Sequence, residues 1–194
     1  MSGPRIVLGS TSVYRAELLR RLLPAFEQRA PGTDEVALTG ESPVDRALRL
    51  AIAKADAAGA GQLDALIIGS DQVAELNGSI LDKPGTAERA RAQLAASSGH
   101  EVQFHTALCL LDTRDGMRYT HIDHTRVRFR ILSETEISRY VARENPLDCA
   151  GSFKCEGLGI SLFERIDNED PTALIGLPLI ALARLLREAG ITLP

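Results

Sequence analysis

The chain has 194 residues, of which 44% are hydrophobic, and this suits one globular domain or two small lobes with a sizeable core. Its 22 Lys+Arg against 26 Asp+Glu give a net charge of −4, which argues against a general binder of nucleic acid or anionic membranes. Any anionic ligand must therefore be held by a local basic cluster.

The sequence gives little indication of a membrane span, a signal peptide or disulfide bonds. No apolar run approaches the roughly 20 residues that a membrane span needs, and the apolar segment near the start is too short for a signal peptide. Three cysteines, with no C-x-x-C pair, argue against a disulfide framework and a structural zinc site: Cys109, Cys149 and Cys155. We expect a cytoplasmic protein with reduced thiols and with no nucleic-acid or membrane partner.

The first segment predicts a strand, a hydroxyl-rich turn and a helix. Arg5–Gly9 forms the strand, Ser10 to Ser12 can cap the helix, and the helix covers about Val13 to Leu23. Such a helix start suits an anion, because backbone N–H groups and the helix dipole both point at the ligand. Arg15 opposes the dipole unless a phosphate binds there. The alternative is ordinary capping with an exposed arginine.

The second segment presents acids before a helix. After a short strand over residues 26–30, the loop at residues 31–35 carries Asp34 and Glu35, and Ser42 opens a helix to about Ala58. We expect this helix to bury Leu48, Ala51, Ile52 and Ala55. Lys54 lies near that stripe, so it either snorkels to solvent or reaches into a site.

The third segment holds the strongest functional signal. Residues 66–68 are predicted to form a buried strand that places Asp71 and Gln72 at its carboxyl end, where open α/β sheets bind their ligands. Asp82 and Lys83 follow on a turn, and carboxylates beside a lysine suit a divalent metal and phosphate oxygens. The alternative is an exposed turn with a solvated ion pair.

The remaining elements predict an alternation of strands and helices. A hairpin turns at Asn77-Gly78, and His121 and His124 should face opposite sides of a strand rather than share a metal. Ser133 and Glu136 form a capping box. The expected strands cover residues 101–112, 118–132 and 160–166, with Val127, Phe129 and Ile131 buried, and the expected helices cover residues 86–98, 133–143 and 179–188.

Seven motifs together resemble those of the Maf nucleotide pyrophosphatases, and the resemblance covers nearly the whole chain. The motifs are Ser10-Thr-Ser-x-x-Arg15, Asp34-Glu35, Lys54 within its helix, Gly69-Ser-Asp-Gln72, Lys83-Pro84, Ser152-Phe-Lys-x-Glu156 and Ile175-Gly-Leu-Pro178. Each motif by itself is weak evidence for the family, but the seven motifs in this order are specific to it. The resemblance favours functional roles for Arg15, Lys54 and Lys83 over the alternatives given above.

The resemblance implies an α/β fold of the Maf and inosine-triphosphate-pyrophosphatase type. That fold has an elongated mixed sheet flanked by helices and two lobes with a central cleft, here as a single domain over residues 1–194. The implied reaction is hydrolysis of a nucleoside triphosphate to the monophosphate and pyrophosphate with a divalent cation, Mg, Mn or Co. The resemblance leaves the oligomeric state open, with a homodimer as one candidate.

The resemblance also assigns residue roles. Asp71 would be the proton acceptor and, with Glu35, a metal ligand, and Lys83 would complete the catalytic group. Around the triphosphate would lie Ser10, Arg15, Lys54 and Lys154. These roles suit attack of water on the α-phosphorus, which needs a base, cations and a metal held by few carboxylates.

Three positions resemble the YceF branch, which hydrolyses 7-methyl-GTP: Tyr14, Gln72 and Glu156. Because 7-methylguanine carries positive charge, an aromatic face such as Tyr14 gains roughly 0.5–2 kcal/mol from it, and Glu156 can accept hydrogen bonds from the purine edge. The alternatives are a dTTP/UTP pyrophosphatase, which has other residues at these positions, and a nucleotide-binding regulator of cell division.

Overall fold

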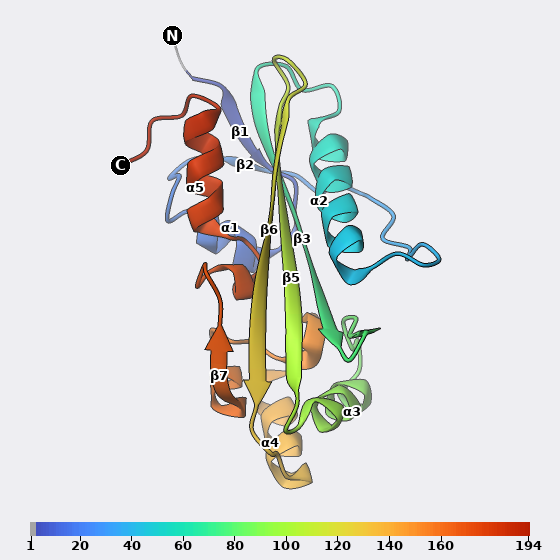
Figure 1. Cartoon of the computed structure of the whole chain (residues 1–194). Helices are drawn as coiled ribbons and strands as arrows, with labels where there is room; N and C mark the ends of the chain where they lie inside the picture. The colour runs from blue at the N-terminus through green and yellow to red at the C-terminus, as the bar shows by residue number, and fades with distance from the viewer. Residues whose placement is uncertain (1–2) are drawn as a thin grey trace. The chain divides into compact units, whose positions relative to one another are not determined.

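A mixed β-sheet forms the centre of the computed structural model, which describes residues 3–194. Its strand order is β2-β1-β3-β5-β6-β7, with β4 paired to β3 (Figure 1). Strand β1 runs parallel to β2 and β3, whereas the β3–β4 and β6–β7 pairs are antiparallel. The strands are β1 Arg5–Leu8, β2 Glu27–Gln28, β3 Ala65–Leu76, β4 Ser79–Ile80, β5 Glu101–Asp112, β6 Arg118–Phe129 and β7 Phe163–Asp167.

Four of the α-helices begin where the sequence places hydroxyl caps. The Ser12, Ser42 and Thr86 side chains each accept a hydrogen bond from the backbone N–H three residues on, and Ser133 and Glu136 form both halves of the expected capping box. The α-helices are α1 Val13–Leu19, α2 Pro43–Gly59, α3 Ala87–Ser97, α4 Glu134–Glu144 and α5 Leu179–Glu188, and the short 3₁₀ helices are η1 Ala150–Ser152, η2 Leu158–Leu162 and η3 Ala173–Ile175.

The chain divides into two compact units. The first unit runs up to Asp71 and adds Thr106–Asp123 and Asp170–Pro194, and the second comprises Gln72–His105 and His124–Glu169. Strands β3, β5 and β6 therefore contribute residues to both units. The expectation of a single domain over residues 1–194 stays a prediction.

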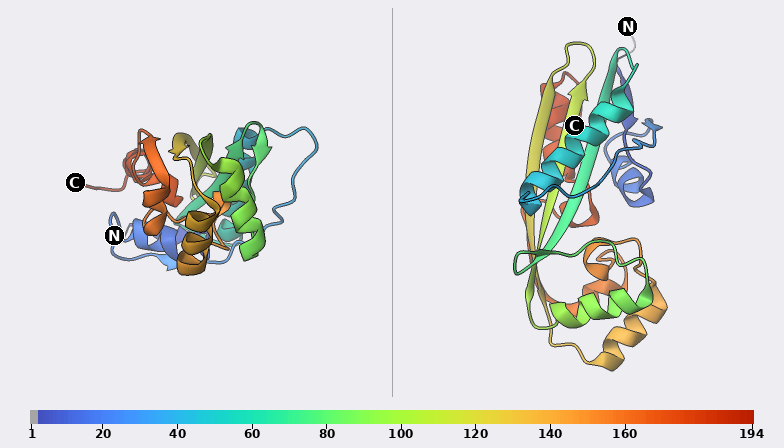
Figure 2. Two further views of the ribbon diagram at one scale, coloured as in Figure 1. Left: turned by 90° about the horizontal axis from the view of Figure 1, so that it is seen from below. Right: turned by 90° about the vertical axis from the view of Figure 1, so that its right-hand side faces the viewer.

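In the first unit, helices cover both faces of the sheet (Figure 2). Leu66 and Ile68 of β3 join the apolar cluster that α1 and α5 complete, with Leu19 and Leu182 fully buried. Because side chains alternate along a strand, the intervening positions face the other side, where Gly69 lies against α2. The first unit is thus a helix–sheet–helix arrangement.

The second unit has an aromatic core beside the paired helices α3 and α4 (Figure 2). Four of the five phenylalanines of the chain meet edge to face, with ring centroids 4.8–5.7 Å apart: Phe104, Phe129, Phe153 and Phe163. Such pairs contribute roughly 0.5–1.5 kcal/mol each beyond area burial.

The main correction concerns the central strand. We expected Asp71 at the carboxyl end of a short strand, but β3 continues without interruption to Leu76, so Asp71 lies in its middle. The pairing with β1 nevertheless stops at Ile68, because β1 itself ends at Leu8. Asp71 therefore follows the end of the parallel pair rather than the end of its strand.

Four smaller expectations were also inaccurate. Helix α1 ends at Leu19 rather than Leu23, and β7 starts at Phe163 because the preceding residues form η2. Ile131 lies beyond the end of β6 and is 83% exposed. On α2 the buried side chains are Ala47, Leu50, Ala51, Lys54, Ala55 and Ala58, so Lys54 belongs to the buried face itself.

Across residues 3–194, no helix has both the length and the apolar character to cross a bilayer.

Candidate functional site

Two glycines bring α2 into direct contact with the sheet. A Cβ at Gly69 would lie 2.2 Å from the Ala51 carbonyl oxygen, and a Cβ at Gly9 would lie 2.9 Å from the Lys54 carbonyl oxygen. Neither contact leaves room for a side chain. The close approach places Lys54 on the helix beside Asp71 on the strand.

Lys54 makes two short ionic contacts. Its Nζ atom donates a hydrogen bond to Asp71 Oδ1 at 2.6 Å and lies 2.6 Å from Glu35 Oε1. The Lys54 and Asp71 side chains are 8% and 9% exposed, whereas the Glu35 side chain is 50% exposed. The cluster is thus buried at its base and open to solvent at Glu35.

Arg15 is held beside this cluster by the C-terminal segment of the first unit. Its Nε donates to the Gly176 carbonyl at 2.8 Å and its Nη1 to Ser10 Oγ at 3.4 Å. The Gly176 carbonyl also accepts the hydroxyl of Ser70 at 3.0 Å. Sequence reasoning assigned no role to Ser70 or Gly176, although both lie within the quoted motifs.

Burial shifts the pKa values of Asp71 and Arg15. The pKa of Asp71 is raised, chiefly because desolvation disfavours its carboxylate, and the positive charges of Lys54 and Arg15 oppose that effect. Desolvation also lowers the pKa of Arg15, against the pull of Asp71 and Glu35. A carboxyl group with raised proton affinity beside cations is typical of acid–base sites.

The loop that carries Glu35 is anchored to α2 by two arginines. Arg49 makes a bidentate ion pair with Glu41, in which Arg49 Nη2 donates to Glu41 Oε2 at 2.7 Å. Arg49 Nη2 also donates to the Val36 carbonyl at 3.1 Å. Arg46 donates to the Glu35 carbonyl at 3.5 Å. These arginines were missed, although their spacing of three residues, which places both on one side of the helix, was a readable signal.

The first unit thus unites five of the expected site residues: Ser10, Arg15, Glu35, Lys54 and Asp71. Tyr14, the sixth, is half-buried on α1 in the same unit. The other expected residues belong to the second unit: Gln72, Lys83, Lys154 and Glu156. Their grouping with Asp71, and the cleft expected there, stay predictions.

In the second unit, the local structure fixes Lys154 firmly. Its backbone N–H donates to the Tyr140 hydroxyl at 3.0 Å, and its Nζ donates to the Glu144 carbonyl at 3.3 Å. A Cβ at Gly159 would lie 2.3 Å from the Lys154 carbonyl oxygen, which explains the glycine. Lys83 is exposed on its turn, beside the buried Pro84.

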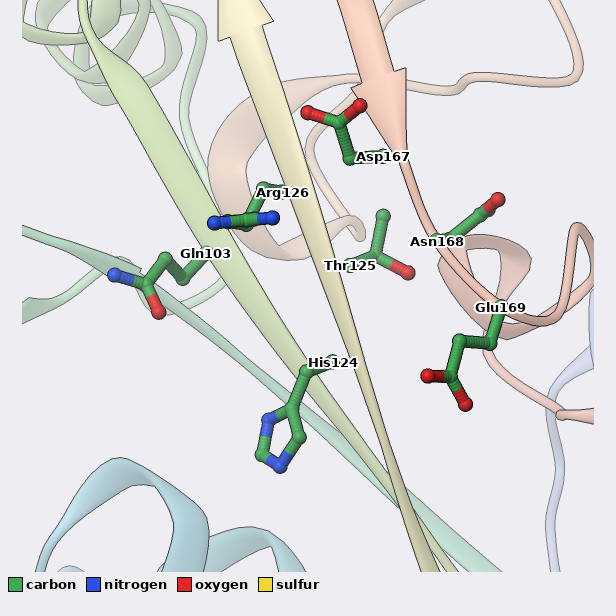
Figure 3. Close-up of a pocket in the computed structure, with 7 residues that line it drawn as sticks. All are labelled: Gln103, His124, Thr125, Arg126, Asp167, Asn168 and Glu169. Atoms are coloured by element: carbon green, nitrogen blue, oxygen red, sulfur yellow. The ribbon is translucent and has the colours of Figure 1, made fainter.

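A polar pocket of about 480 Å³ lies elsewhere in the second unit (Figure 3). It is lined by Gln103 of β5, three successive residues of β6 and the segment after β7: His124, Thr125, Arg126, Asp167, Asn168 and Glu169. None of the residues expected at the site lines this pocket.

The carboxylates of the first unit fit a divalent cation that arrives with phosphate. Glu35 and Asp71 offer hard oxygen ligands, and magnesium is usually held by one or two carboxylates plus substrate phosphates. No group of three or more His, Cys, Asp or Glu ligands occurs within residues 3–194, so the part of the chain that the structure describes has no closed metal cage.

The solved structure of the Ham1 protein of Staphylococcus aureus has a TM-score of 0.54 and 18% identity, covering 95% of this chain and 99% of that one. This likeness confirms the expected α/β fold class. The sequence pattern described as "Maf-like protein" matches residues 5–189. The chain belongs to the Maf family.

Curated relatives are similar over nearly their full length. A protein of Xanthomonas axonopodis pv. citri (strain 306) is 57% identical over 192 residues, which is 98% of this chain and 100% of the relative. One of Burkholderia thailandensis is 54% identical over 190 residues, covering 96% of this chain and 88% of the relative. Both relatives are named 7-methyl-GTP pyrophosphatase.

Proposed function

We propose that this protein is a nucleoside triphosphate pyrophosphatase that hydrolyses 7-methyl-GTP to 7-methyl-GMP and pyrophosphate, and so removes a modified nucleotide. The observation that carries the proposal is the cluster of Lys54 with Asp71 and Glu35, beside Arg15. Cations and carboxylates in this arrangement suit phosphoryl chemistry. The names of the Xanthomonas and Burkholderia relatives support the substrate.

In the proposed reaction, Asp71 orients the attacking water and accepts its proton at a carboxylate oxygen. Its raised pKa favours this role, because a stronger base takes a proton more readily. Lys54 and Arg15 hold the triphosphate oxygens and neutralise charge that builds up on the leaving pyrophosphate. Ser10, bonded to Arg15, adds a hydroxyl contact to the phosphates.

A divalent cation, magnesium, manganese or cobalt, would supply further charge neutralisation on the phosphates. Glu35 and Asp71 would hold it. Lys83 and Lys154 of the second unit would contact the pyrophosphate end of the substrate.

The base would be selected by Tyr14, Gln72 and Glu156. The cationic 7-methylguanine ring gains from the face of Tyr14, and Glu156, which is exposed, accepts hydrogen bonds from the purine edge. Glu156→Gln should lower the preference for 7-methyl-GTP over GTP, and an unchanged preference would contradict this assignment.

We further propose that the enzyme acts in the cytoplasm on free nucleotides rather than on nucleic acid, with a homodimer as the candidate assembly. Light scattering of the purified protein tests the assembly, and a monomer mass would contradict it.

The experiment is pyrophosphate release with magnesium or manganese, comparing 7-methyl-GTP, GTP, dTTP, UTP and CTP at one concentration. We expect 7-methyl-GTP to be hydrolysed fastest. Faster hydrolysis of dTTP or UTP would support the proposed reaction but contradict the proposed preference for 7-methyl-GTP. Nucleotide binding without any hydrolysis would favour the regulator of cell division.

A further inference from the structure

One oxygen of each carboxylate assigned to the metal already contacts an ammonium group. Lys54 Nζ lies 2.6 Å from both Glu35 Oε1 and Asp71 Oδ1. Carboxylate oxygens accept hydrogen bonds and bind cations, but they cannot serve an ammonium group and a divalent ion at the same point. The position of Lys54 therefore bears directly on how a metal reaches the site.

The lysine is held in place by the fold. Lys54 lies on the buried face of α2, and its backbone carbonyl is packed against Gly9. The Lys54 and Asp71 side chains are 8% and 9% exposed, so little water screens the attraction between them. A metal ion would have to overcome this attraction at Asp71, whereas Glu35, which is 50% exposed, is open to solvent.

We infer that Lys54 is an internal cation that competes with a divalent metal for Glu35 and Asp71. The free protein then binds metal weakly. When a triphosphate is present, its oxygens offer the Lys54 ammonium alternative acceptors, and the carboxylates become available to the metal. Metal and nucleotide binding are coupled through this one side chain, so each strengthens the other.

The inference rests on the proposed function only for the nature of the ligand. The coupling itself is a property of three side chains and can be measured without any turnover. An inactive protein would contradict the proposed function and leave the competition intact.

Binding of Mn²⁺ without nucleotide, followed by electron paramagnetic resonance, provides the test. Lys54→Met should bind Mn²⁺ at least about tenfold more tightly than the wild type, because a cation in contact with both ligands is removed. Arg15→Met is the matched control: Arg15 also feels the charges of Asp71 and Glu35 but donates its hydrogen bonds to Gly176 and Ser10. Its affinity should change by less than about threefold, as expected for a cation without contact.

Equal Mn²⁺ affinity in the wild type and Lys54→Met would overturn the inference. An equal gain in Lys54→Met and Arg15→Met would also overturn it, because net charge and not contact would then decide. If Lys54→Met fails to fold, Mn²⁺ binding is measured in the wild type with and without a non-hydrolysable triphosphate. The triphosphate should tighten Mn²⁺ binding by more than the affinity of the free triphosphate for Mn²⁺ accounts for. In Lys54→Gln this coupling should be smaller. Coupling of equal size in both proteins would contradict competition by Lys54.

Discussion

Lys54 Nζ lies 2.6 Å from Asp71 Oδ1, so a helix cation and a strand carboxylate meet across the interface between α2 and the sheet. Burial of such a pair is costly unless both charges are satisfied, so a buried ion pair is weak evidence for stability, and strongly perturbed ionisable groups cluster at functional sites. The contact links the fold of the first unit to its proposed chemistry.

The close approach at Gly69 provides the first prediction. In Gly69→Ala, the new Cβ would lie 2.2 Å from the Ala51 carbonyl oxygen and 2.6 Å from the Ala55 nitrogen, so α2 has to move. We expect a loss of about 1–3 kcal/mol in the free energy of unfolding, measured by urea denaturation, together with loss of hydrolysis. Gly3→Ala is the control, because within residues 3–194 no atom beyond the adjoining residue lies within 4 Å of its Cβ position. Equal stability of Gly69→Ala and wild type would contradict the packing argument.

The ion pair of Arg49 and Glu41 provides the second prediction. Arg49→Ala releases both Glu41 and the Val36 carbonyl, so the loop that carries Glu35 loses one of its two anchors on α2. We expect kcat/KM to fall between about tenfold and a hundredfold, as for a displaced catalytic group. In a double-mutant cycle, Glu41→Ala should add little to Arg49→Ala. Fully additive losses would mean that the two residues act separately.

The three thiols should be inert in the folded protein. Burial is the main reason why the thiol pKa values are raised, each from 9.0 to about 12, in Cys109, Cys149 and Cys155. Because the thiolate is the reactive form, their reaction with DTNB near neutral pH should be roughly a thousandfold slower than that of a free thiol. Urea should restore ordinary rates. Rapid labelling of the native protein would show that one thiol is exposed and ionised.

The capping box of α4 should make stability depend on pH. Hydrogen bonds from the backbone N–H and hydroxyl of Ser133, and then from Arg130, lower the pKa of Glu136 from 4.5 to about 2. Ionised Glu136 therefore stabilises the fold above pH 4.5, and this contribution is lost as the pH falls towards 2. The stability difference between wild type and Glu136→Gln should shrink over that range. Glu134→Gln, in the same helical turn, is the control and should show a smaller difference at neutral pH.

Much of the fold was predictable because local signals were consistent. Hydroxyl caps fixed the starts of α1, α2 and α3, and Asn77-Gly78 fixed the β3–β4 turn, where both residues have positive φ. The length of β3 was not predictable, because Gly69, Ser70 and Asp71 are typical of a strand end. Its neighbouring strands and the packing of α2 keep those residues extended.

The chemistry of the site was partly readable. Motif order indicated Asp71, Lys54 and Glu35 through a family resemblance, but no local pattern showed that one ammonium group contacts both carboxylates. That contact depends on Gly9 and Gly69, which admit α2 to the sheet. A carbonyl such as that of Gly176, which holds Arg15, carries no side-chain signal at all.

The role of Asp71 in attack on the α-phosphorus is tested by hydrolysis of 7-methyl-GTP in ¹⁸O-labelled water, with the products analysed by mass spectrometry for the wild type and Asp71→Asn. We predict one labelled oxygen in 7-methyl-GMP, unlabelled pyrophosphate, and loss of both products in Asp71→Asn. Formation of 7-methyl-GDP with labelled inorganic phosphate, or undiminished hydrolysis by Asp71→Asn, would contradict it.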